Sequence, residues 1–167
     1  MTDVLVQFVR ARLDEDRECA LKAASRVEGG SSWAFAEMEV RAGDGAPVTR
    51  HTWADEGAHI ARHDPDRVLH EVAAKRLQLD EALASRHHIS PDQYETCPVA
   101  TTVDGLDETQ AAALERLNEE QRQESGGEPI CWVSCGRDAR VRRTLELLAM
   151  PYSEHPGYTQ ALAANRA

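Results

Sequence analysis

Residues 56–76, EGAHIARHDPDRVLHEVAAKR, contain the strongest structural signal of the sequence, a helix start at Asp64-Pro65. The Asp64 carboxylate can accept hydrogen bonds from the first unpaired amides of a helix, and Pro65 has no amide hydrogen to leave unpaired. The apolar residues that follow recur at helical spacing and are Val68, Leu69, Val72, Ala73, Leu77, Leu79 and Leu83. The pattern predicts a helix over residues 64–86.

The segments on either side of this helix predict three more. Apolar stripes at helical spacing indicate helices over residues 3–26 and 137–150. A further helix, over residues 107–124, begins with the capping-box pair Asp107 and Gln110. It has few apolar residues, so we expect it to lie on the surface.

A β-hairpin is expected between the first helix and the central one. The stretch WAFAEMEVR (33–41) alternates between two sets of side chains, and VTRHTW (48–53) can return after the turn AGDGAP. Gly43 and Gly45 can adopt the positive φ that such turns need. The hairpin is predicted over residues 33–53.

The remaining segments show little regularity. Residues 91–135 are expected to be irregular outside the helix at 107–124, with a short strand candidate at 130–134, and residues 151–167 are expected to form a tail. Together the elements predict a single α+β domain over residues 1–167 that is mostly helical. It has three core helices (the first, central and last), one surface helix and a small antiparallel hairpin.

Composition limits the classes of partner. The 167 residues include 29 acidic and 19 basic side chains, a formal net charge of −10. Such a surface repels phosphate backbones, so we expect no direct nucleic-acid binding. No apolar run approaches the roughly 18 residues of a membrane span, and the start lacks a signal-peptide pattern. We therefore expect a cytoplasmic protein with no membrane contact.

In the cytoplasm the four cysteines are expected to be reduced thiols. Cys19 lies near the apolar stripe of the first helix and is expected to be a small buried residue. Cys97, Cys131 and Cys135 could close a tetrahedral zinc site with His87, His88 or His155. Unligated thiols and a redox pair are the alternatives.

His59 and His63 are a second candidate metal site. They are four residues apart, which places them on one face of a continuous helix together with Glu56. Ile60 stands where a zinc hydrolase of the HExxH type has its general base, and the start of a helix at Asp64-Pro65 interrupts the segment. The alternative is a short turn with two structural histidines.

Three arginines form a candidate contact for an anion or a partner. Arg137, Arg140 and Arg143 recur every three residues, with Arg142 beside them. They could bind a carboxylate or a phosphate, or pair with the surplus acids of the protein itself. The sequence contains no phosphate-binding glycine loop, no G-x-S-x-G and no evident Ser-His-Asp set, so we assign no catalytic residue and expect no organic cofactor.

Three stretches are similar to an uncharacterised family of small proteins from actinobacteria and their phages. They are MTDVLVQFVRARLDEDRECA, HIARHDPDRVLHEVAAKR and RTLELLAMPYSEHPGY. The resemblance implies a small cytosolic protein, often encoded by a phage or mobile DNA. Members often have a CPxC-like element before the final helix, whereas this chain has Ala100 in place of the second cysteine.

These observations favour a non-enzymatic acidic binding or regulatory protein that acts on a protein partner. One alternative is a zinc-binding protein, with either a structural zinc or a metal-dependent hydrolase site. Another is a structural component of a phage particle. No pattern specifies an oligomeric state.

Overall fold

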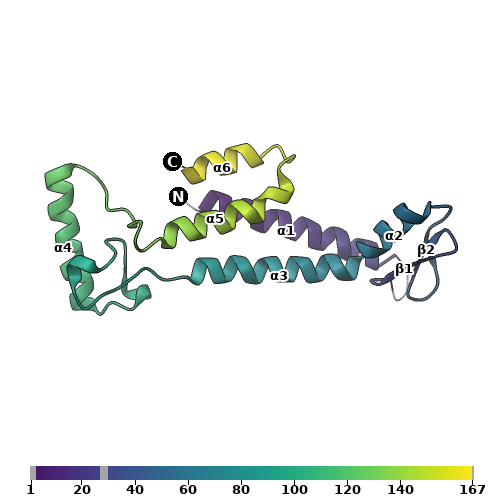
Figure 1. Cartoon of the computed structure of the whole chain (residues 1–167), viewed down its shortest axis with the longest axis horizontal. Helices are drawn as coiled ribbons and strands as arrows, with labels where there is room; N and C mark the ends of the chain where they lie inside the picture. Colours follow the sequence, from purple (N-terminus) through teal and green to yellow (C-terminus); the bar gives the residue numbers. More distant parts are fainter. Residues whose placement is uncertain (1–2, 27–29, 167) are drawn as a thin grey trace. The chain divides into compact units, whose positions relative to one another are not determined.

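The computed structural model describes residues 3–26 and 30–166, which form helices and a small antiparallel sheet (Figure 1). The mostly helical α+β class is therefore confirmed. The described residues group into two compact units. The terminal unit runs up to Leu79 and resumes at Leu148, and the central unit is Asp80–Leu147.

Along the chain, the elements of the central unit lie between the two parts of the terminal unit. The strands are β1 (Trp33–Ala36), β2 (Glu39–Ala42) and β3 (Pro47–Thr49). The helices are α1 (Asp3–Ala24), α2 (Ala54–Arg62), α3 (Pro65–Ala84), α4 (Glu108–Ser125), α5 (Arg137–Ala149) and α6 (Tyr158–Arg166), with 3₁₀ turns η1 (Gln93–Glu95), η2 (Thr102–Asp104) and η3 (Met150–Tyr152). The unit boundary falls within α3 and α5. Among the described helices, none has the length and apolar content of a membrane span.

The predicted helices at 3–26, 64–86, 107–124 and 137–150 are confirmed as α1, α3, α4 and α5, with bounds that differ by one or two residues. The short strand expected at 130–134 is wrong, because these residues form a loop and a turn. That loop belongs to the candidate metal centre.

The sheet is a three-stranded meander in the order β1-β2-β3, where we predicted a two-stranded hairpin. The strand expected over 33–41 is divided at Glu37 and Met38, whose φ values are 51° and 62°. This tight turn pairs Ala36 with Glu39. Positive φ at both central residues is the type I′ geometry, whose twist matches that of the flanking strands. The apolar alternation continues across the turn, so the sequence pattern alone did not reveal it.

Asp64 joins the sheet to the long helix α3. One carboxylate oxygen accepts a hydrogen bond from the Arg67 amide at 2.8 Å, which is the predicted helix cap. The other oxygen accepts from the Trp33 amide at 3.1 Å, at the beginning of β1. A single side chain thus satisfies a free amide in each of two elements.

The segment before Asp64 is a helix, α2, and the short turn that we expected there is wrong. Helix α2 contacts β1 and β2. Gly57 lies at this contact, where an added Cβ would be 2.2 Å from two carbons of the Phe35 ring. Glycine therefore allows α2 to lie directly against β1, and its neighbours His59 and His63 are exposed.

The C-terminal segment expected as a tail folds back onto α1 within the terminal unit. Helix α6 contacts α1, and its Ala161 is buried. The Phe8 ring lies edge-on to Tyr152 and His155, with centroids 6.5 and 5.4 Å away. The Arg12 guanidinium lies over the Phe8 ring and bonds to the His155 ring. Aromatic contacts therefore hold in place a segment that was expected to form a tail.

Helix α1 buries one face and exposes the other. Leu5, Val9 and Leu13 are fully buried, and Asp14 forms an ion pair with Arg76 of α3. Cys19, which we predicted to be buried, is exposed. It lies on the solvent side of the stripe, because the buried residue of this turn is the neighbouring Ala20.

Replacing Asp64 by Ala is expected to lower the free energy of unfolding of the terminal unit by about 2 kcal/mol, since it removes a helix cap and the acceptor of the Trp33 amide. Asp64→Asn retains one acceptor oxygen and should cost about half as much. Urea denaturation followed by tryptophan fluorescence measures both. Equal stability of Asp64→Ala and the wild type would contradict the double role.

The Tyr152 hydroxyl donates to the Asp16 carboxylate at 2.6 Å. Burial, followed by this hydrogen bond and the Asp16 charge, raises the pKa of Tyr152 above its usual value. Because the pKa of Tyr152 is raised, its hydrogen bond to Asp16 stabilises the fold at neutral pH. This contribution is lost as the pH rises through the pKa of Tyr152 in the folded protein. Titration at 295 nm should show a tyrosine ionising well above pH 10, absent in Tyr152→Phe. An unchanged titration curve in that variant would contradict the assignment.

Candidate metal centre

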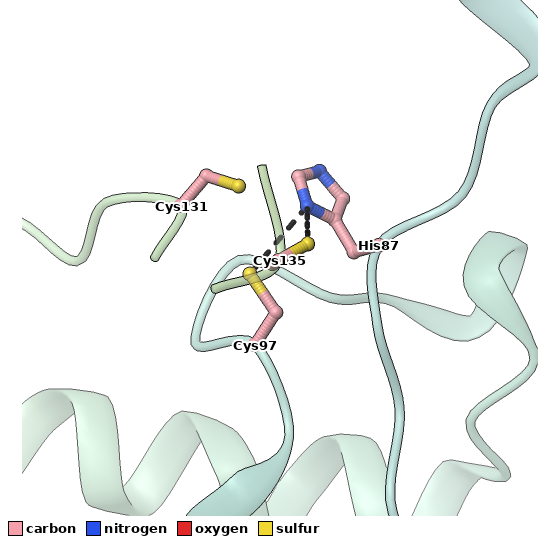
Figure 2. A group of neighbouring side chains, drawn as sticks. All are labelled: His87, Cys97, Cys131 and Cys135. Atoms are coloured by element: carbon pink, nitrogen blue, oxygen red, sulfur yellow. Dashed lines mark hydrogen bonds between the residues drawn. The ribbon is translucent and has the colours of Figure 1, made fainter. Parts of the chain in front are cut away.

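Four side chains with metal-ligand chemistry converge in the central unit from three segments (Figure 2). His87 lies in the extended segment after α3, Cys97 follows η1, and Cys131 and Cys135 lie in the loop before α5. Pro98 and Pro129 keep two of these segments out of helices. Gly136, with φ of 65°, ends the turn that contains Cys135 and allows α5 to begin.

The ligand atoms of these four residues all lie within 4.8 Å of one another. The Nδ1 atom of His87 is 3.5 Å from the Sγ of Cys97 and 3.8 Å from the Sγ of Cys135. Figure 2 shows the Cys131 sulfur turned toward the same space. Among the described residues, this is the group of three or more such side chains that could hold an ion.

These separations fit the edges of a tetrahedral zinc site. Bond lengths of about 2.3 Å to sulfur and 2.0–2.1 Å to nitrogen place a sulfur and a nitrogen ligand roughly 3.5–3.6 Å apart, and two sulfurs about 3.8 Å apart. The two measured sulfur–nitrogen distances lie at or close to these values. Three thiols and one imidazole are also a donor set that zinc prefers. The residues present therefore fit the ion.

The outer contacts of His87 hold its ring in the orientation that a ligand needs. With Nδ1 facing the sulfurs, Nε2 lies 3.7 Å from a carboxylate oxygen of Asp138. The backbone amide of His87 donates to the Asp104 carboxylate at 2.7 Å. A carboxylate behind a ligating histidine fixes its tautomer and increases its basicity. Asp138 itself is held by Arg137 at 2.8 Å.

The thiols differ in how readily they ionise. Burial raises the pKa of Cys97 to about 11, and the nearby thiols Cys131 and Cys135 add to the rise. Burial opposes ionisation at Cys135 too, but amide hydrogen bonds from His88 and Arg137, together with His87, lower its pKa to about 6. The His88 amide is 3.2 Å from the Cys135 sulfur. Cys135 therefore ionises more readily than Cys97, and metal binding must displace the proton of Cys97.

The apolar core beside the centre is small. It consists of Cys97, Ala100, Leu106, Leu114 and Cys135, packed against the partly buried Val99, Ala111 and Cys131. Three of these residues are the cysteine ligands themselves. Small units with so little apolar burial usually depend on a metal or a disulfide for stability.

The structure brings together the predicted trio Cys97, Cys131 and Cys135 and selects His87 from three candidate histidines. His88 is exposed and contributes its amide instead. His155 belongs to the terminal unit, where it contacts Phe8 and Arg12.

The second candidate site, His59 and His63, has its two rings 4.5 Å apart. Both rings are exposed, and the described chain brings no third ligand to them. A metal contact at this pair therefore stays a prediction.

Two of the three candidate arginines of α5 donate hydrogen bonds to backbone carbonyls of the protein itself. Arg137 donates to the carbonyls of Ser85 and Leu83 at 3.1 and 3.3 Å, at the end of α3. Arg140 donates to the Cys135 carbonyl at 2.9 Å. Arg143 is exposed and has no partner in the described part of the chain, so an anion or partner contact there stays a prediction.

Sequence reasoning missed the two carboxylates that position His87, Asp104 and Asp138. Asp104 was detectable as the last residue of a capping box with Thr101, both of whose hydrogen bonds are present. Asp138 had no such signal, because its contact with His87 joins residues far apart in the sequence.

Comparison with family models matches residues 2–163 to a family of unknown function, DUF6221. The chain belongs to this family. Comparison with curated proteins and with solved structures gave no match. The assignment to DUF6221 confirms membership of an uncharacterised family, and the chemistry must be inferred from the residues themselves.

Removing the carboxylate behind His87 should weaken metal binding without removing a ligand. Asp138→Asn is expected to lower zinc affinity about 10- to 100-fold, the range seen for outer-shell carboxylates. Competition with a chromophoric chelator measures the change. Glu120→Gln, an exposed acid on α4, is the control and should leave the affinity within twofold. Equal affinities for the two variants would remove Asp138 from the site.

Proposed function

We propose that this protein is a non-enzymatic binding protein whose central unit is organised by a structural zinc ion. The observation that carries the proposal is the convergence of His87, Cys97, Cys131 and Cys135, whose ligand atoms lie within 4.8 Å of one another. The ligands come from three segments without helix or strand, which are also joined by hydrogen bonds such as that from the Cys97 amide to the His88 carbonyl at 3.0 Å. A bound ion would hold those segments together.

The donor set supports a structural role over a hydrolytic one. Four protein ligands complete the tetrahedral shell of zinc, whereas catalytic zinc keeps one position for water or substrate. Cys97 and Cys135 are also buried, which limits access to the centre. The metal-dependent hydrolase alternative is therefore the weaker form of the zinc hypothesis.

The distribution of charge supports a role in binding a protein. Residues 89–128 contain ten acidic residues, two arginines and no lysine, so this segment has a formal charge of −8 out of −10 for the whole chain. A surface of this kind repels nucleic acid and attracts basic proteins. The acidic segment is the part of the chain that contains Cys97 and α4.

The setting is part of the same proposal. We propose a cytoplasmic location, where reducing conditions would keep the three cysteines available as ligands. The resemblance to small proteins of actinobacteria and their phages supports an origin in a phage or mobile element. No described feature favours a virion component over a soluble binding protein, and mass spectrometry of purified virions tests that alternative.

Purified protein should contain about one equivalent of zinc by elemental analysis. Cys97→Ser and Cys135→Ser should each lose the metal and lower the melting temperature, because a structural zinc supplies much of the folding free energy of a small unit. Cys19→Ser is the matched control, since Cys19 is exposed on α1 of the other unit, and it should keep both metal and stability. Less than about a tenth of an equivalent in the wild type, with melting unchanged by chelator, would overturn the proposal.

A spectroscopic measurement on the wild type avoids the risk that the serine variants fail to fold. Cobalt introduced in place of zinc should give the intense visible bands of a tetrahedral site and the near-ultraviolet charge-transfer bands of thiolate ligands. Weak bands typical of six oxygen or nitrogen ligands would contradict the ligand set.

A further inference from the structure

A hollow of about 480 Å³ lies in the central unit between the segment Ser90–Thr96 and the first turns of α4. Leu106 and Leu114, both buried, are among its lining residues and also belong to the apolar core that contains Cys97 and Cys135. Ala113 lines the hollow from α4, and Tyr94 lies at it with most of its ring exposed. Its volume is in the range of pockets that bind ligands.

The polar groups at the hollow do not suit an anion. The first amides of α4 could attract negative charge, but the Asp107 carboxylate accepts from the Gln110 amide at 2.8 Å, and the Gln110 side-chain oxygen accepts from the Asp107 amide at 3.0 Å. Asp92, another lining residue, adds a negative charge at the hollow, and its carboxylate accepts from the Tyr94 amide at 2.9 Å. An occupant with apolar and cationic groups is favoured.

The acidic charge extends from the hollow along α4. Glu120 and Glu124 follow Ala113 at helical spacing and are exposed. Neither forms an ion pair in the described chain, whereas Glu115, Glu119 and Glu128 share Arg122. Arg116 is the basic residue near this stripe. Helix α4 is roughly 27 Å long at 1.5 Å per residue. The acidic side chains from Asp92, beside the hollow, to Glu124 thus extend along most of that length.

We propose that this hollow docks a Lys/Arg-rich segment of a partner protein, which inserts one bulky apolar side chain over Leu106 and Leu114. The apolar floor accounts for the inserted side chain, and the flanking carboxylates account for the basic residues. A small amine would reach only one end of the acidic stripe, whereas a polypeptide can follow it. The inference rests on the proposed function, because Cys97 anchors the wall of the hollow next to Thr96.

The probe is a fluorescein-labelled heptapeptide with a central tryptophan between two runs of three lysines. Fluorescence anisotropy at about 20 mM salt, on full-length protein of measured zinc content, should show saturable binding. Replacing tryptophan by glycine in the peptide should weaken binding about tenfold, since the apolar side chain no longer fills the hollow. Replacing the lysines by glutamates should abolish it.

Two matched pairs of protein variants test the location. Ala113→Trp fills the hollow and should weaken peptide binding about tenfold, whereas Ala112→Trp, exposed on the same helix, should leave it within twofold. Glu120→Lys should weaken binding about threefold or more, whereas Glu81→Lys makes the same charge change on α3 and should have less effect.

The inference is overturned if zinc-loaded wild type does not bind the tryptophan peptide, or if the acidic peptide binds as well. It is equally overturned if Ala113→Trp and Ala112→Trp, or the two lysine variants, behave alike. Because zinc is measured on the same samples, loaded protein that ignores the peptide leaves the structural zinc standing. If protein that cannot hold zinc still binds the peptide, the docking site is supported and the structural zinc is contradicted.

Discussion

In the central unit, four side chains that could hold a metal ion meet from segments with almost no regular structure of their own. Cys97 and Cys135 are also two of the five buried residues of the apolar cluster beside them. Burial alone therefore offers little to hold His87, Cys97 and the loop of Cys131 and Cys135 in place. An ion bound by all four would provide the missing attraction and would fix the end of α3, the wall of the hollow and the beginning of α5 together.

The two units are stabilised by different kinds of contact. The terminal unit buries whole faces of α1 and α3 and closes its ends with specific contacts, such as Asp64 on two backbone amides and Phe8 against the C-terminal aromatics. The central unit has a polar helix, α4, whose buried positions include the amide residue Asn118. Its side chain donates to the Pro98 carbonyl at 2.8 Å, next to a ligand. In the central unit, polar contacts and candidate ligands therefore provide the stabilisation that buried apolar faces provide in the terminal unit.

Local signals in the sequence were sufficient for α1, α3, α4 and α5, but they did not reveal α2 and α6. Asp64-Pro65 and the Asp107–Gln110 pair each fix a helix start through bonds between neighbours, so both starts were predictable. The turn at Glu37–Met38 was not, because neither residue type favours positive φ. The three cysteines were identifiable as a set from their chemistry. Choosing His87 over His88 required the fold, since adjacent residues of an extended segment point to opposite sides.

Helix α4 begins and ends between two of the four ligands, Cys97 and Cys131. Residues 98–130 therefore form a loop closed at both ends by the candidate metal centre. The entropic cost of closing such a loop changes only slowly with its length. Insertions, deletions or charge changes within this loop should consequently leave the four side chains able to meet. The acidic surface of α4 can then be altered by substitution without a new scaffold.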